Sequence, residues 1–167
     1  MKVAIVALLF AASALAQGPS ADPAAACGPE NISFKVKLDA PNMLAQPYPG
    51  MALVYFIHDS GGAGALGYPT TKLGIDGAWV GANHNDSYFS VSVIPGEHHL
   101  CATLQSSLVD QRVELAHFTA VAGKVYYYRT RLVMSRQVEL LELDPIDSDQ
   151  GKYLIATFPL SVSTPKK

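Results

Sequence analysis

The sequence predicts an all-β protein, an antiparallel β-sandwich of about eight strands, with a short C-terminal segment that also fits a helix. Apolar and polar residues alternate with period two along most of the chain beyond residue 31, as in strands with one face in a core and one in water. Turn residues separate these runs at intervals of roughly 8 to 14 residues. The length of 167 residues, 49% of them apolar, fits one globular domain.

Residues 1–16 have the pattern of a secretory signal peptide. Lys2 supplies a positive charge, residues 3–12 form an apolar run, and Ala14-Leu15-Ala16 is a small-x-small cleavage signal. A membrane-spanning helix needs about 20 apolar residues, which neither this run nor any later segment supplies. We therefore expect cleavage after Ala16 and export to the periplasm or the cell surface, with no transmembrane segment left. The alternative is a lipoprotein in which Cys27 carries the lipid.

The segment after the signal is rich in Pro, Gly and Ala, so residues 17–31 are predicted to be a flexible linker. Cys27, within it, and Cys101 are the two cysteines of the chain. In an oxidising compartment such a pair can close one disulfide. We expect this bond to tie the N-terminal segment to a strand in the middle of the chain; the alternative is two independent thiols.

The predicted domain covers residues 32–163, followed by a C-terminal tail over residues 164–167. Alternation is clearest over residues 34–38, 88–94 and 113–118. Turn signals lie between the runs, at Asp76-Gly77, Pro95-Gly96 and Gly123-Lys124. Asp-Gly between two short runs predicts a hairpin.

The segment near the C-terminus is ambiguous. Ser148 fits the N-cap of a short helix over residues 149–156, with acidic residues near its start. Residues 152–160 also alternate enough to form a strand. Both interpretations stay open at this stage.

Three strings resemble a known family: ALVYFIH from residue 52, KLGIDGAWVGANHNDSYFSVSVIPGEHHLCA from residue 72, and AGKVYYYRTRL from residue 122. Over about residues 51–145 the chain resembles the DUF2846 domain, a bacterial domain of unknown function in exported and envelope proteins. The PGEHHL element is also similar to that of PEGA-type surface β modules. The resemblance implies an exported bacterial β-sandwich and supplies no activity, ligand or catalytic residue.

Histidines are the candidate metal ligands. A site built from His84, Asp86 and either His98 or His99 is one hypothesis. His98 and His99 are consecutive on a predicted strand, so they point to opposite faces and cannot share one metal without a bulge. The competing interpretation makes His98 a histidine at the core edge that hydrogen-bonds the Pro95-Gly96 turn. No cofactor is predicted.

Aromatic side chains suggest a second candidate site. Trp79, Tyr126, Tyr127, Tyr128 and Arg129 would suit stacking on a sugar or contact with a protein partner if they were exposed. In a strand, Tyr126 and Tyr128 share one face and Tyr127 takes the other. The alternative is an aromatic ladder that stabilises the sheet.

Charge and motifs argue against several functions. The net charge of -2 gives no basic surface for nucleic acid. There is no GxSxG nucleophile motif and no phosphate-binding glycine loop, so we expect no enzyme. We predict an exported, non-catalytic binding or structural module of the bacterial cell envelope, whose partner is an envelope protein or a glycan. The alternative is a His-based metal-binding protein or metal-dependent enzyme.

Overall fold

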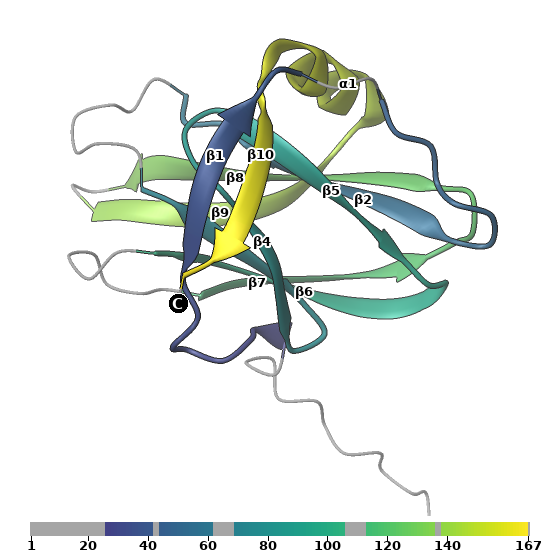
Figure 1. Cartoon of the computed structure of the whole chain (residues 1–167), viewed down its shortest axis with the longest axis horizontal. Helices are drawn as coiled ribbons and strands as arrows, with labels where there is room; N and C mark the ends of the chain where they lie inside the picture. The colour runs from purple at the N-terminus through teal and green to yellow at the C-terminus, as the bar shows by residue number, and fades with distance from the viewer. Residues whose placement is uncertain (1–25, 42–43, 62–68, 106–112, 136–137, 167) are drawn as a thin grey trace, which may run out of the picture.

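A computed structural model describes residues 26–41, 44–61, 69–105, 113–135 and 138–166, and these residues form two packed β-sheets and one helix (Figure 1). The predicted all-β sandwich is therefore confirmed. The described residues contain ten strands rather than about eight. The strands are β1 Phe34–Asp39, β2 Ala52–His58, β3 Thr71–Ile75, β4 Ala78–Asn83, β5 Ser87–Val93, β6 Gly96–Leu104, β7 Val113–Ala120, β8 Val125–Ser135, β9 Val138–Ile146 and β10 Leu160–Pro165.

Strands β9 and β10 are the last two strands of the described residues. In β9 two leucines are adjacent at Leu140 and Leu141, which breaks the period of two that marks a strand in sequence. Part of β10 falls in the predicted tail: Thr164 and Pro165 pair with Lys35 and Phe34 of β1. The prediction of a free tail is thus wrong for residues 164 and 165, because both ends of the domain meet in one antiparallel strand pair.

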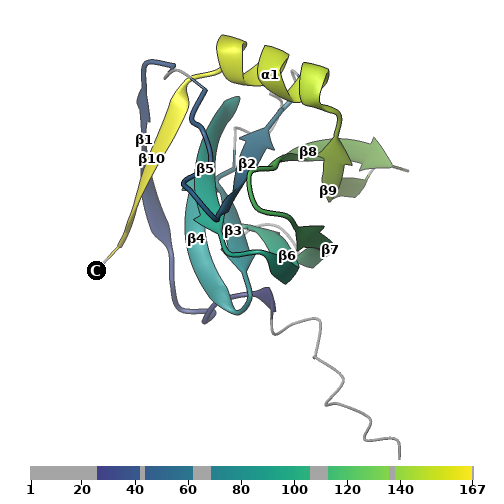
Figure 2. The ribbon, with the colours of Figure 1, turned by 90° about the vertical axis from the view of Figure 1, so that its right-hand side faces the viewer.

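The larger sheet has the strand order β1-β10-β5-β2-β8-β9, and the smaller has the order β4-β3-β6-β7 (Figures 1 and 2). Most pairs are antiparallel, as predicted, but β2 pairs with β8 in parallel, and β10 meets β5 in parallel at one residue pair. The parallel pair follows from the connections. The chain reverses at the β5–β6, β6–β7 and β7–β8 links, so β8 runs opposite to β5 and in the direction of β2, which is antiparallel to β5.

Strand β2 is the centre of the core, and all seven of its residues are buried. Val54 and Phe56 face the smaller sheet, within the cluster between the two sheets. Leu53, Tyr55 and Ile57 face the other way, into a second cluster closed by the helix. A strand covered on both faces needs a continuous apolar run, which explains the sequence ALVYFIH.

The helix α1 spans Ser148–Thr157 and packs Leu154 and Ile155 on the outer face of the larger sheet (Figure 2). The helical interpretation of this segment is correct. The strand that follows the helix is β10, which begins at Leu160. The expected cap is wrong by one residue. Asp147 is the N-cap, and its carboxylate Oδ1 accepts hydrogen bonds from the N–H groups of Asp149 and Gln150, both at 2.9 Å.

The Asp76-Gly77 hairpin joins β3 to β4 as predicted. Asp76 has φ 50 and Gly77 has φ 83, the left-handed pair that a two-residue type I′ turn requires. The Gly123-Lys124 turn lies between β7 and β8, and Pro95 lies in the link between β5 and β6, with Gly96 as the first residue of β6.

Residues 26–31 lie against the domain. Ala26 is 3% exposed, its carbonyl accepts a hydrogen bond from Gly77 N at 3.1 Å, and Cys27 forms a disulfide with Cys101. The prediction of a flexible linker is therefore wrong for residues 26–31, because the disulfide and these contacts dock the segment on the smaller sheet. Residues 17–25 and the predicted signal peptide, residues 1–16, lie outside the described residues. In the part of the chain that the structure describes, no helix is long and apolar enough to cross a membrane.

Candidate functional site

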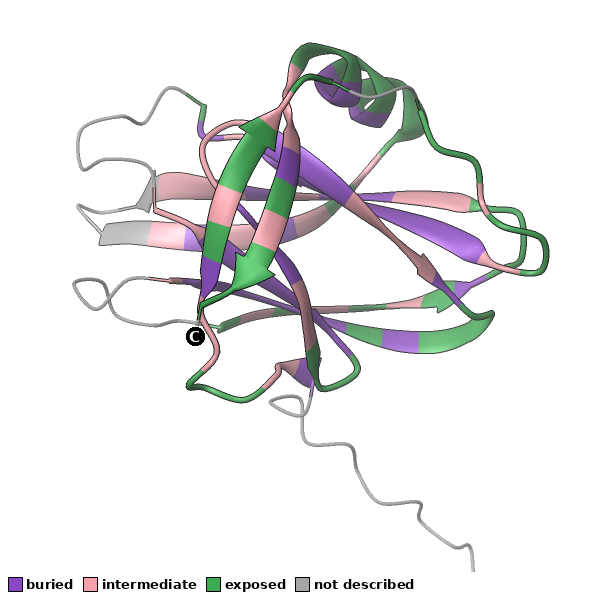
Figure 3. Cartoon of the chain, in the orientation of Figure 1, coloured by how far each residue is buried: buried purple, intermediate pink, exposed green. Residues whose placement is uncertain are grey.

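The two outer faces of the sandwich differ in what covers them. The larger sheet is covered by α1 and by the segment before β2, where Ala45 N donates to the Tyr55 hydroxyl at 2.7 Å. On the smaller sheet, exposed and buried residues alternate at the start of β6, from Glu97 to Leu100 (Figure 3), and exposed and half-buried residues alternate along β7 from Val113 to Phe118. We call the outward side of these two strands the outer face; its side chains are Glu97, His99, Cys101, Thr103, Val113, Leu115, His117 and Thr119.

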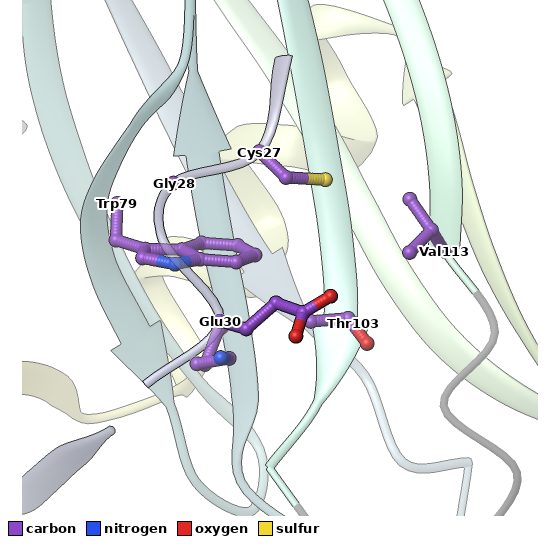
Figure 4. A pocket seen from close by; sticks show the side chains of 7 residues that line it. Cys27, Gly28, Glu30, Trp79, Thr103 and Val113 are labelled. Carbon is purple, nitrogen blue, oxygen red and sulfur yellow. The ribbon is translucent and has the colours of Figure 1, made fainter. Parts of the chain in front are cut away.

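A pocket of about 210 Å³ lies where the N-terminal segment crosses this outer face (Figure 4). The disulfide Cys27–Cys101 fixes the segment to β6, and the indole Nε1 of Trp79 donates to Pro29 O at 2.8 Å. Gly28 lies directly on the Trp79 side chain, since a Cβ at Gly28 would be 2.3 Å from its Cδ1 atom. The pocket is lined by Cys27, Gly28, Glu30, Lys72, Trp79, Thr103 and Val113.

Lys72 supplies a positive charge at the pocket. Its side chain is nearly buried, its Nζ donates to Ile32 O at 2.9 Å, and Nζ lies 4.3 Å from the centroid of the Trp79 ring. Burial lowers the pKa of Lys72, and nearby Glu30 only partly opposes this shift. A cation, a carboxylate and apolar side chains therefore line a space about the size of one large side chain.

Of the predicted aromatic surface, Trp79 lines this pocket. Tyr127 and Tyr128 are buried, and the Tyr127 ring stacks on Tyr55 of the neighbouring strand with centroids 5.5 Å apart. The half-buried Tyr126 donates its hydroxyl to Thr119 O and accepts from Val121 N, both at 3.0 Å. The tyrosines thus stabilise the fold, as the aromatic-ladder alternative states.

Phe118 of β7 explains why the even-numbered tyrosines are unavailable. Its ring centroid lies 4.8 Å from that of Tyr126 and 5.6 Å from that of Tyr128, so these rings fill the space between the two sheets. The Arg129 side chain is 15% exposed, and its guanidinium lies 3.8 Å from the Asp59 carboxylate. The predicted surface of three tyrosines beside Arg129 is therefore not formed.

The side chains of the four predicted metal ligands do not converge on one point. His84 Nδ1 lies 3.2 Å from the Thr70 hydroxyl, and Asp86 accepts hydrogen bonds from the N–H and hydroxyl groups of Ser60 at 2.7 and 2.6 Å. His98 faces the core while His99 is exposed. Within the described residues, no group of three or more His, Cys, Asp or Glu side chains is placed to hold a metal. The structure does not assemble the predicted site.

His98 plays the structural role that the competing interpretation gave it. Its Nε2 lies 2.7 Å from Ile94 O, directly before the Pro95-Gly96 turn, and its Nδ1 lies 2.6 Å from Asp76 Oδ2. Burial alone would lower the pKa of His98, but the Ile94 carbonyl and the Asp76 carboxylate outweigh burial and raise it. Burial would raise the pKa of Asp76, but hydrogen bonds from His99 N and His98 lower it.

A buried histidine lies at the opposite end of the sandwich. His58, the last residue of β2, is fully buried, with Nδ1 3.0 Å from the Thr130 hydroxyl. Its Nε2 has no hydrogen-bond partner among the described residues. Burial lowers the pKa of His58 to about 4. In the sequence, the only feature that distinguishes His58 from the other histidines is its position at the end of an apolar run.

Sequence reasoning missed three of the pocket residues, Glu30, Lys72 and Val113, because no local pattern in the sequence links them to Trp79. Comparison with known proteins adds no relative: no family model, no curated protein and no solved structure matches the chain. The candidate site is therefore defined by its geometry alone.

Proposed function

We propose that this protein is an exported, non-catalytic binding module of the bacterial cell envelope, and that it binds a partner protein on the outer face of the smaller sheet, at the Trp79 pocket. The observation that carries the proposal is the pocket itself. A disulfide, a tryptophan hydrogen bond and a glycine contact hold the N-terminal segment at its edge. Pre-organised walls of this kind reduce the entropy lost on binding.

The surroundings of the pocket extend the contact surface. Val113 and Leu115 on β7 are 44% and 41% exposed, and Val113 also lines the pocket. Apolar side chains next to a pocket favour an interface in which one partner side chain enters the pocket and its neighbours cover the aliphatic residues.

A protein partner fits this surface better than a glycan. Sugar rings stack on an open aromatic face, whereas the Lys72 ammonium lies over the Trp79 ring and Gly28 packs against the same side chain. Lys72 and Glu30 offer both charge signs at the pocket, which suits the mixed polar and apolar groups of a polypeptide.

Export is supported by the signal pattern of residues 1–16 and by the disulfide, since such bonds persist in oxidising compartments. The lipoprotein alternative is disfavoured, because the Cys27 sulfur forms the disulfide and a lipid thioether needs the same sulfur. Mass spectrometry of the native protein should find a chain that begins at Gln17. A full-length chain beginning at Met1 would contradict export by this route.

Site-specific photo-crosslinking in the native envelope tests the partner. A photoreactive residue at Leu115 should give a discrete protein adduct, and one at Tyr153, 68% exposed on α1, should not. Val113→Asp should abolish the Leu115 adduct while circular dichroism stays unchanged. An adduct from Tyr153 alone would overturn the choice of surface. Co-sedimentation with envelope polysaccharide that is lost in Trp79→Ala would identify a glycan instead.

A further inference from the structure

Two histidines form a cross-strand pair on the outer face, outside the pocket. His99 on β6 and His117 on β7 are register partners in an antiparallel pair, and both side chains are exposed. Their ring centroids lie 6.5 Å apart. Directly opposite residues on one face of a sheet have Cβ atoms about 5 Å apart, so the two imidazoles project side by side from a rigid base.

This spacing suits a transition metal ion. Imidazole nitrogens bind such ions at about 2.0 to 2.1 Å, which brings two rings on one ion to roughly 5 to 6 Å between centroids. Exposed side chains reach that separation by small rotations about their side-chain bonds. Imidazole is a preferred ligand of copper, nickel and zinc, and Cu²⁺ binds most tightly of the divalent ions in this series.

The neighbouring charges also favour a cation. Glu97 lies on the same face, two residues before His99, opposite Thr119. The carboxylate of Asp76 accepts a hydrogen bond from the backbone N–H of His99 at 2.9 Å, but it also pairs with the imidazole of His98, so Glu97 is the carboxylate that favours a cation here. This pair differs from the group of candidate ligands in the sequence analysis, because it shares only His99 with that group.

We propose that His99 and His117 chelate a divalent transition metal ion, Cu²⁺ most tightly, on the outer face of the smaller sheet. Since no third His, Cys, Asp or Glu side chain of the described residues completes a metal site, water fills the remaining coordination positions. This proposal does not depend on a partner protein at the Trp79 pocket.

The test is a calorimetric titration of the untagged, oxidised mature chain with Cu²⁺ at pH 7.5, where free imidazole is mostly neutral. His99→Gln and His117→Gln should each weaken Cu²⁺ binding by at least about tenfold, because even substitutions of residues around a metal ligand commonly weaken metal affinity by about 10- to 100-fold. His84→Gln is the matched control, because it removes a histidine that contacts Thr70 on another part of the fold, and it should keep wild-type affinity.

A second measurement separates chelation from loose association. In excess Zn²⁺ the midpoint of thermal unfolding should rise for the wild type and not for His117→Gln, because an ion that joins β6 to β7 binds only the folded chain. Wild-type affinity in His99→Gln or His117→Gln would overturn the proposal. Equal loss of affinity in His84→Gln would overturn it as well.

Discussion

The imidazole of His98 lies between two acceptors, Asp76 Oδ2 at 2.6 Å from Nδ1 and Ile94 O at 2.7 Å from Nε2. Neither a carboxylate nor a carbonyl can donate a hydrogen bond, so both ring nitrogens must carry a proton. The buried ring thus links the β3–β4 hairpin to the turn between β5 and β6. Because Nε2 is occupied by a backbone carbonyl, this Asp–His pair is structural and has no free nitrogen for proton transfer.

His98→Phe should lower the free energy of unfolding by about 2 kcal/mol, since it removes two charge-assisted hydrogen bonds and keeps a ring beside Phe118. Urea denaturation at neutral pH measures this loss. Asp76→Asn is the matched control and should cost less, about 1 kcal/mol, because asparagine keeps an acceptor for His99 N and tolerates the φ of 50. Unchanged stability in His98→Phe would show that the two bonds contribute nothing net.

Reduction of the Cys27–Cys101 disulfide should lower the free energy of unfolding by about 4 kcal/mol, the value that chain entropy gives for a loop of this length. The sequence separation is 74 residues. Trp79 is the one tryptophan in the chain, and it contacts the segment that the bond holds. Its fluorescence should therefore shift to longer wavelength on reduction, before global unfolding. Identical spectra and unfolding midpoints for the two redox states would contradict this account.

Much of the fold could be predicted because its signals are local. Asp76-Gly77 defines a hairpin through its own backbone preferences, and the alternation along Phe34–Leu38 defines a strand without reference to its neighbours. The adjacent leucines of β9 and the position of Asp147 depend on the burial of both sheet faces and on helix geometry. The alternation of apolar and polar residues in the sequence therefore could not predict these features.

The candidate site could be predicted only in part because distant residues form it. Trp79 was identified by residue type, but the pocket needs the disulfide to bring Glu30 to it. Tyr127 and Tyr128 face opposite sides of β8, as the sequence indicates. That both sides are covered depends on α1 and on Phe118, and no pattern within the tyrosine run contains that information.

Stability should fall as the pH drops from 6.5 towards 4, because of His58. Its pKa is about 4 in the folded state against 6.5 for the ordinary group, since burial disfavours the charged ring, while Asp86 and Asp59 only partly oppose this and His84 adds to it. Between these two pH values the unfolded chain binds a proton and the folded chain does not, so the stability is complete above pH 6.5 and declines below it. The total decline from this group is on the order of 3 kcal/mol.

The measurement is the free energy of unfolding of wild type and His58→Gln at pH values across that window. The variant should show a shallower decline, whatever its overall stability, because glutamine does not titrate. His117→Gln is the control, since it removes an exposed side chain that meets water in both states. If the free energy of unfolding fell equally with pH in wild type and His58→Gln, burial would not lower the pKa of His58.

Gly151→Ala should destabilise the protein although alanine favours helices by about 1 kcal/mol over glycine. A Cβ at Gly151 would be 2.4 Å from two carbons of the Tyr127 ring, so α1 would have to move away from the sheet. Overpacking of this kind costs about 1 to 3 kcal/mol, which outweighs the gain in propensity. Gln150→Ala, on the exposed side of the same turn, should change stability by less than about 0.5 kcal/mol.

A double-mutant cycle decides whether the tyrosine ring is the cause. In a Tyr127→Leu background the smaller side chain leaves room for the new methyl group, so Gly151→Ala should cost less than in the wild type, and the helix propensity of alanine should make it neutral or stabilising. Urea denaturation of the four proteins gives the coupling energy directly. If Gly151→Ala changed the free energy of unfolding equally in both backgrounds, the contact between Gly151 of α1 and Tyr127 of β8 would not be the cause of the destabilisation.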